Sequence, residues 1–330
     1  MNRKKILAAG NFYLDTIVVR DYPEGPAQQR NFTERVVIEK VGATCGNVVS
    51  ILAHLGEDVY PIAKLDDSPE GKKIADDLRR YGCCDRFVTN TPDGGTTTLR
   101  CTHKMDAEGN KVVKFRAGSP GGSRFPRKRV LRGRDEAPAF LSELDFIPDV
   151  FFFDTPDMGH RVLAKGLREK GSLIYFEPEG MKDNSVTRSI EVSDIVKFSG
   201  EKIPDTAFTD AYPDKLFIQT LGDKGLRFRL CGGAWTSLPA VPVEKVVDWE
   251  GAGDWTTSMI IHGLCGRGIL SVKEMTRAAI TEILQEAQKA ASRSVGFLSS
   301  KGMIHAETSS QYSLLSSTPR ESKISDFTQE

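Results

Sequence analysis

The chain has 330 residues, 39% of them hydrophobic, and its 45 basic residues balance its 45 acidic ones. A chain of this length can bury one large core, and zero formal net charge argues against a general nucleic-acid or membrane-surface binder. The six cysteines lack metal-site or secreted-scaffold spacing, and no signal or spanning segment is recognisable, so we expect reduced thiols in a cytoplasmic protein.

The first predicted element is a buried strand that begins with the apolar run at residues 5–9 and ends near Asp15. Ligands of open α/β sheets bind beyond the carboxyl ends of strands, where a carboxylate can accept hydrogen bonds from two neighbouring hydroxyls. Asp15 is therefore a candidate ligand contact, and an ordinary turn aspartate is the alternative. A β-like run at 35–40 then leads through Gly42 and Asn47 into a predicted helix at 48–55. Asn47 suits a sugar hydroxyl, but it is also a good helix cap.

The next part of the chain predicts a strand at 60–63, a helix from about 66 to 81, and a β-hairpin over 95–115. With residues 34–40 this hairpin could form a small lid. Arg100 lies on the hairpin and is a candidate for facing the site, with an exposed strand position as the alternative. The basic run 124–134 is interpreted either as an anion clamp or as a solvated loop.

From Phe146 the chain alternates apolar strands, among them 150–153, 173–176, 195–198 and 216–218, with helices such as one at 158–169. This alternation predicts a parallel sheet buried on both faces. Asp154 follows one of these strands. Gly222 and Gly225, after the strand that ends near Thr220, predict a tight turn between strands whose N–H groups could contact a ligand. The Ser- and Thr-rich segment 306–330 is expected to be a peripheral helix or a mobile tail.

One stretch near the C-terminal third combines small residues with a carboxylate at a predicted helix start. Gly251, Ala252 and Gly253 allow successive N–H groups to point into one concavity at the positive end of the helix, which suits an anion. Asp254 beside a bound anion is explained if it takes a proton from a nucleophile that attacks that anion. Phosphoryl transfer to a hydroxyl needs this arrangement.

Residues 248–254 resemble the second signature of the PfkB (ribokinase-like) carbohydrate kinase family, a pattern close to Asp-Thr-x-Gly-Ala-Gly-Asp. Residues 42–56 resemble its first signature, although Ala43 stands at the usual second glycine and Val49 at a usual small residue. The turn 220–225 resembles the family's Thr-Leu-Gly-x-x-Gly. A NAD-binding dehydrogenase, in contrast, would need a glycine fingerprint after the first strand that Gly10-Asn11-Phe12 does not supply.

The resemblance implies an α/β fold, a ribokinase-like three-layer α/β/α sandwich with a mostly parallel central sheet and a small antiparallel β lid. The kinase domain would span residues 1–305, with lid segments at about 16–40 and 95–116. The expected activity is ATP-dependent phosphorylation of a sugar hydroxymethyl group with Mg²⁺, and K⁺ or a similar cation is a further expectation. The alternatives are a nucleoside kinase, with Phe12 and Tyr13 as a slot for the base, and a non-catalytic relative that binds nucleotide or sugar. A homodimer through the lid is also expected.

The resemblance also implies roles for single residues. Asp254 would be the catalytic base, and the backbone of Gly251, Ala252 and Gly253 would stabilise the transferring group. Acceptor contacts are expected from Asp15, Gly42, Asn47, Asp154 and Arg100. Nucleotide contacts are expected from Thr220, Gly222, Gly225, Ser199 and Asp248. In the family's Asn-x-x-Glu position, Ser199 replaces the Asn and Lys202 the Glu, so Glu201 is the candidate for organising the metal.

Overall fold

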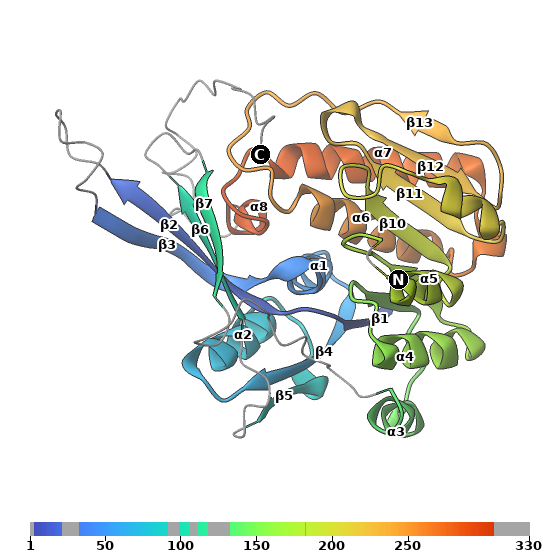
Figure 1. Cartoon of the computed structure of the whole chain (residues 1–330), viewed down its shortest axis with the longest axis horizontal. Helices are drawn as coiled ribbons and strands as arrows, with labels where there is room; N and C mark the ends of the chain where they lie inside the picture. The colour runs from blue at the N-terminus through green and yellow to red at the C-terminus, as the bar shows by residue number, and fades with distance from the viewer. Residues whose placement is uncertain are drawn as a thin grey trace.

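The computed structural model describes residues 3–21, 33–91, 99–105, 111–117, 133–181 and 183–306. These residues form a large sheet of nine strands with helices on both faces, and a separate sheet of four strands that projects from the body (Figure 1). The strands of the large sheet are, in spatial order, β13 (Thr236–Leu238), β12 (Leu226–Leu230), β11 (Leu216–Thr220), β10 (Ile195–Ser199), β9 (Leu173–Phe176), β8 (Val150–Phe153), β1 (Lys5–Ala9), β4 (Asp58–Asp66) and β5 (Val88–Thr91).

The large sheet is parallel from β5 to β11, and only β12 and β13 are antiparallel to their neighbours. Its central strands are apolar throughout because both faces are covered. In β8, Val150 and Phe152 pack on one face, and Phe151 and Phe153 pack on the other. The prediction of a parallel sheet buried on both faces is confirmed.

Two helical layers sandwich the sheet, as predicted. One core contains side chains of α1 (Ala43–His54), α2 (Pro69–Arg80), α6 (Ala252–Arg267) and α7 (Arg277–Ser294). The core on the opposite face contains side chains of α3 (Glu136–Glu143), α4 (Met158–Glu169) and α5 (Asn184–Glu191). The short α8 (Gly302–Ala306) follows α7. Short 3-10 helices lie at η1 (Asp85–Phe87), η2 (Ala207–Ala211), η3 (Gly222–Lys224) and η4 (Val272–Glu274).

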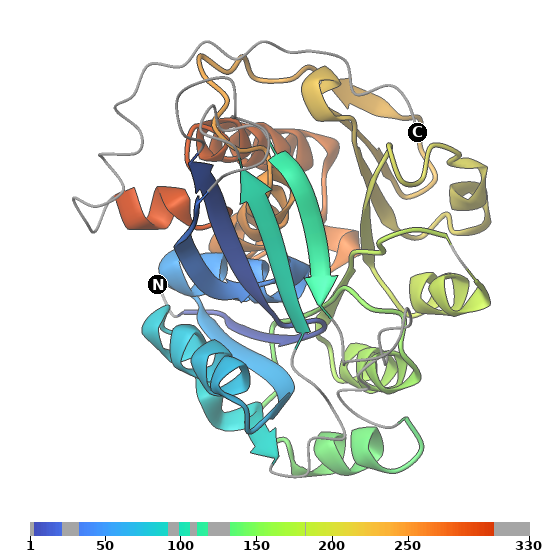
Figure 2. The same ribbon diagram turned by 60° about the vertical axis from the view of Figure 1, so that its left-hand side comes forward.

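The small sheet has the order β3 (Thr33–Gly42), β2 (Tyr13–Asp21), β6 (Leu99–Met105) and β7 (Lys111–Ala117). Figure 2 shows its strands in front of the body. The predicted lid and its hairpin are confirmed, with one difference. The pairs β2–β3 and β6–β7 are antiparallel, but the central pair β2–β6 is parallel, so the lid is mixed.

Two predicted boundaries are wrong in ways that matter for the site. The first strand ends at Ala9, and Asp15 lies inside β2, because Gly10 separates β1 from the lid. Helix α1 begins at Ala43, so Asn47 lies inside the helix and does not cap it; Gly42 is the N-cap residue. In the described part of the chain, no helix is long and apolar enough to cross a membrane. The basic run up to residue 132 and the segment 307–330 lie outside the described residues.

Candidate functional site

The start of α6 is the centre of the candidate site. Its N-cap residue, Gly251, has a φ of +89°, a left-handed conformation that favours glycine. A Cβ atom at this position would lie 2.3 Å from the Cβ atom of Ser300. The indole N–H of Trp255, one turn into the helix, donates to the Ser300 carbonyl oxygen over 2.7 Å. The turn before α6 and the loop around Ser300 therefore form one interlocked unit.

Asp254 lies in the first turn of α6 and is only 9% exposed. The side-chain amide of Asn47 donates to its Oδ2 atom over 2.7 Å. Burial, followed by the nearby Glu177 carboxylate, raises the pKa of Asp254 to about 7, and this hydrogen bond, Lys197 and Lys301 oppose the rise. A carboxylate that is half ionised near neutral pH suits general base catalysis.

The backbone donors of this turn are not all available to a ligand. The N–H group of Ala252 donates to the Trp249 carbonyl oxygen over 3.3 Å, within the turn. The first N–H groups of a helix have no acceptor inside the helix, so those of Gly253 and Asp254 are the candidates for holding an anion. Of the predicted set Gly251, Ala252 and Gly253, only the N–H of Ala252 has a hydrogen bond within the turn, and Asp254 adds a further candidate donor.

A buried lysine supports the same helix start from the large sheet. Lys197 of β10 donates from its Nζ atom to the Gly253 carbonyl oxygen over 3.1 Å and to the carboxylate of Glu177. The second oxygen of that carboxylate accepts from the Thr257 hydroxyl over 2.6 Å. Glu177 follows β9, so this network ties two strand ends to the first turns of α6.

The predicted acceptor residues Asp15, Gly42 and Asn47 lie together where the lid meets the body. The carboxylate of Asp15 packs so closely on Gly42 that a Cβ atom there would lie 1.8 Å from its Oδ2 atom. Asp15 and Asn47 share one small pocket with side chains from three other segments. The lining residues are Asp15, Ile17, Ile38, Lys40, Val41, Asn47, Glu250, Ser299, Ser300 and Lys301.

Ala43, the residue that follows Gly42 at the start of α1, has a strained backbone. Its φ is +64°, in the left-handed region that an L-residue with a Cβ atom adopts at a cost of about 1 kcal/mol. A side chain of α2 supports the chain just before it, since the Val41 N–H donates to the Asp77 Oδ2 atom over 3.0 Å. The unusual residue therefore keeps the backbone conformation that a glycine would adopt here.

Asp154 and Phe12 are both buried, and each has structural contacts within the body of the protein. Asp154 is 2% exposed, and its two oxygens accept the backbone N–H groups of Asn11 and Cys45 over 3.2 and 2.9 Å. Burial raises its pKa well above the usual range. We therefore assign Asp154 to fastening β1 to α1. Phe12, one of the two residues considered for a nucleobase slot, packs in the core next to α1, whereas the other, Tyr13, is partly exposed in β2. Arg100 lies opposite Leu14 in the lid, and its side chain is outside the described residues.

Four of the predicted nucleotide-binding residues, Ser199, Thr220, Gly222 and Gly225, lie at the carboxyl ends of β10 and β11 or in the turn that follows β11. Ser199 and Thr220 are direct neighbours in the parallel ladder. The turn that follows has φ values of +60° at Gly222 and +91° at Gly225, and a Cβ atom at Gly225 would lie 2.3 Å from the Leu238 carbonyl oxygen. Within the turn, Lys224 and Gly225 donate to the carbonyl oxygens of Leu221 and Gly222, so the N–H of Gly222 is the donor we assign to a ligand.

Asp248 and Glu201 lie in loops, where their contacts are hydrogen bonds that involve backbone N–H groups. The carboxylate of Asp248 accepts the N–H groups of Glu250 and Ser299 over 3.0 and 3.1 Å, so it clasps the two loops of the interlocked unit. Glu201 is exposed, and its N–H donates to the Ser199 hydroxyl. Among the described residues, no group of three or more metal-binding side chains is close enough to hold an ion by itself. Mg²⁺ in such a site depends mainly on phosphate oxygens and water.

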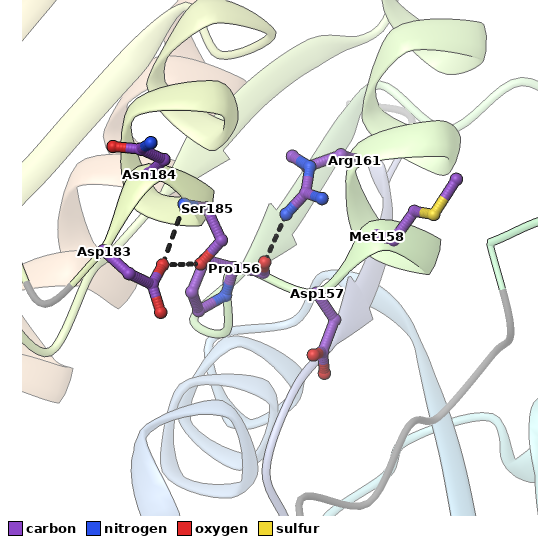
Figure 3. A pocket seen from close by; sticks show the side chains of 7 residues that line it. All are labelled: Pro156, Asp157, Met158, Arg161, Asp183, Asn184 and Ser185. Atoms are coloured by element: carbon purple, nitrogen blue, oxygen red, sulfur yellow. Dashed lines mark hydrogen bonds between the residues drawn. The ribbon is translucent and has the colours of Figure 1, made fainter.

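A second hollow opens between the starts of α4 and α5 (Figure 3). Figure 3 shows Arg161 turned towards the Pro156 carbonyl oxygen, while Asp183 accepts from the backbone and hydroxyl of Ser185. This hollow contains none of the residues predicted from the sequence, and its two carboxylates and one guanidinium favour no ligand of either charge. The candidate site is therefore the region around Asp254.

Sequence reasoning missed Lys301 and Ser300, which touch Asn47 directly. Both donate to the Asn47 Oδ1 atom, Ser300 over 2.9 Å. It also gave Lys197 no role of its own, although a single charged residue inside the apolar strand at 195–198 is a signal that could have drawn attention to it. Lys301 lies outside every motif, and only its place in a stretch of small and apolar residues distinguishes it.

Comparison with known proteins finds similar structures but no match by sequence. No family model matches the chain, and no curated protein matches it. Among solved structures, Arabidopsis thaliana ribokinase complexed with ribose and ATP is similar with a TM-score of 0.67 at 17% identity, over 94% of this chain and 100% of that one. Xylella fastidiosa fructokinase with bound ATP has a TM-score of 0.65 at 14% identity, over 91% and 94%. Burkholderia thailandensis nucleoside kinase in complex with inosine has a TM-score of 0.61 at 17% identity, over 90% and 92%. The chain therefore has the ribokinase-like fold.

Proposed function

We propose that the chain is an ATP-dependent kinase that phosphorylates a hydroxymethyl group of a sugar. The observation that carries the proposal is Asp254, a buried carboxylate with a pKa of about 7 at a helix start. Candidate hydroxyl-binding residues lie on one side of it, and the candidate nucleotide-binding turn lies at the ends of β10 and β11. A base and anion-binding N–H groups in this order match what phosphoryl transfer to an alcohol requires.

In the proposed reaction Asp15 accepts hydrogen bonds from the sugar and orients its hydroxymethyl group. Asp254 takes the hydroxyl proton, the freed oxygen forms a bond to the γ-phosphorus of ATP, and the bond from that phosphorus to the bridging oxygen of ADP breaks. The N–H groups of Gly253 and Asp254 hold the transferring phosphoryl group. Mg²⁺ carried by the ATP phosphates would neutralise part of their charge. Ser199, Thr220 and Gly222 are assigned to the nucleotide.

We favour a sugar over a nucleoside as the acceptor. The buried position of Phe12 removes one wall of the slot that a nucleobase would need. The requirement for K⁺, the dimer through the lid, the cytoplasmic location and the metal-organising role of Glu201 stay predictions. The first two are tested by assays in K⁺ against tetramethylammonium salts and by light scattering of the purified protein.

The decisive experiment measures ADP release from Mg-ATP across free sugars, sugar phosphates and nucleosides, for the wild type and Asp254→Asn. We expect release with one sugar class, lost in the variant. A preference for sugar phosphates would favour the anion-clamp interpretation of residues 124–134. Detectable ATP binding without turnover on any acceptor would favour the non-catalytic alternative, and full turnover by a folded Asp254→Asn would overturn the base assignment.

A further inference from the structure

Lys301 is a buried cation that contacts the acceptor side of the site. Its side chain is 1% exposed, and its Nζ atom donates to the Val41 carbonyl oxygen and to Asn47 Oδ1. Asn47 in turn donates to Asp254 over 2.7 Å. The three residues therefore form a continuous chain from an ammonium group through an amide to the candidate base.

The orientation of the Asn47 amide follows from the chemistry of its neighbours. An ammonium group has only donors, so the atom of Asn47 that faces Lys301 must be the oxygen. The Ser300 hydroxyl donates to the same oxygen over 2.9 Å. Because the Asn47 oxygen already accepts two hydrogen bonds, the amide presents its NH₂ group to the Oδ2 atom of Asp254. This bond stabilises the ionised carboxylate and leaves the Oδ1 atom of Asp254 to take a proton. This pairing also means that Asn47 has no free acceptor for a sugar hydroxyl, in contrast to its predicted role.

The surrounding charges show what Lys301 changes. Asp254 faces the Glu177 carboxylate and the ammonium groups of Lys197 and Lys301. Lys301 itself faces three carboxylates, one thiol, one ammonium group, one imidazole and one phenol ring, which belong to Asp15, Asp77, Asp254, Cys83, Lys40, His305 and Tyr81. Burial lowers the pKa of Lys301 to about 8, so the ammonium group is charged at the pH where Asp254 is half ionised.

We infer that Lys301 is a positioning residue for the proposed reaction: through Asn47 it orients the candidate base Asp254 and favours its ionised form. This inference rests on the proposed function for its effect on turnover. Its effect on Asp254 itself does not depend on the acceptor or on the presence of a reaction. The Lys301 ammonium acts through Asn47 and has no assigned contact with the reacting atoms.

The test compares the wild type with Lys301→Met and Lys301→Gln, in which the side chain is neutral. An opposite charge within a few ångströms lowers the pKa of a carboxyl group by about 1 to 3 units, so we expect its loss to raise the pKa of Asp254 by about one unit. The acid limb of the pH profile of kcat would shift to higher pH by the same amount, about one unit. Turnover would fall about fivefold at pH 7 and by less than about twofold at pH 9, where Asp254 is ionised in every form.

Lys215→Met is the matched control. Lys215 is 2% exposed, and its Nζ atom also binds backbone carbonyl oxygens, those of Ser193 and Glu191 over 2.6 and 3.3 Å. It directly precedes β11 and so lies at the amino end of that strand, whereas the candidate site around Asp254 lies at the carboxyl ends of the parallel strands. The control should lose stability as the Lys301 variants do, and its pH profile should match the wild type.

A second readout separates this inference from the proposed function. The pKa of Asp254 is measured directly by ¹³C NMR titration of carboxyl-labelled protein, with Asp254→Asn for assignment. If no acceptor supports turnover but the Asp254 pKa rises in a folded Lys301 variant, the inference holds and the kinase proposal fails. An unchanged Asp254 pKa in both variants, or an equal change in Lys215→Met, would overturn the inference.

Discussion

Asp254→Asn should make the protein more stable at alkaline pH while it removes activity. The folded state holds the Asp254 proton up to a pKa of about 7, whereas the unfolded chain releases it near 3.8. Between these values the unfolded state binds fewer protons, so the free energy of unfolding falls as pH rises and stays lower above pH 7. Asparagine is neutral at every pH and avoids this loss.

The size of the effect follows from the pKa difference. A shift of about three units corresponds to at most about 4 kcal/mol, at 1.36 kcal/mol per unit. Asparagine also gives up part of the bond from Asn47, because its oxygen is a weaker acceptor than a carboxylate, which reduces the net gain to about 2 kcal/mol. For a chain of 330 residues that gain raises Tm by roughly 3 °C.

Thermal unfolding followed by circular dichroism at pH 4 and pH 8 checks the reasoning. We expect the variant to exceed the wild type in Tm at pH 8 and to differ far less at pH 4, where Asp254 is protonated in the folded state and about half protonated in the unfolded chain. The exposed Asp223→Asn is the control and should shift neither Tm. A difference in Tm that is the same at both pH values would refute the link to ionisation.

Three other substitutions test the geometry of the site. Ala43→Gly should raise the free energy of unfolding by about 1 kcal/mol in urea titrations, because glycine relieves the positive φ; a loss of stability would show that the turn is not strained. Gly251→Ala should cost more than about 2 kcal/mol and most of the turnover, since its Cβ atom has no space beside Ser300, and an unchanged Tm would contradict this. Lys197→Met should cost about 3 kcal/mol in the same titrations, because Glu177 loses its buried partner, and a neutral result would mean that Glu177 finds another one.

The sequence predicted the body of the fold well because its signals there are local. The strand at 173–176 and the helix at 158–169 match the observed elements to the residue, since apolar runs and helical periodicity report burial directly. Asp15 was placed on the wrong strand because the run from Lys5 to Val19 reads as one apolar segment. A single residue, Gly10, lets the chain leave the body for the lid, and its Cβ-free backbone packs against Asp154.

Only those residues of the candidate site that belong to local sequence motifs could be predicted. Asp254, Gly251 and Asn47 belong to recognisable patterns, but the contact from Asn47 to Lys301 joins residues 254 positions apart. No local pattern reports such a contact, and a lone lysine in a C-terminal loop is usually a solvated one. For Asp154 the sequence pattern was ambiguous, because a carboxylate after a strand can fasten backbone N–H groups, as it does here, as well as bind a ligand.

The two lysines beside Asp254 explain how a buried base can remain useful. Burial alone disfavours the charged form of a carboxyl group, and the Glu177 carboxylate adds to this effect, so Asp254 would otherwise stay protonated at neutral pH. Lys197 approaches from β10 and Lys301 from the loop before α8, and both oppose that rise. Each lysine is also a hydrogen-bond donor to the immediate surroundings of the base, Lys197 to the Gly253 carbonyl and Lys301 to the Asn47 amide. The same pair of buried cations therefore sets the charge of Asp254 and the geometry around it, so conservative replacement of either lysine is expected to alter both.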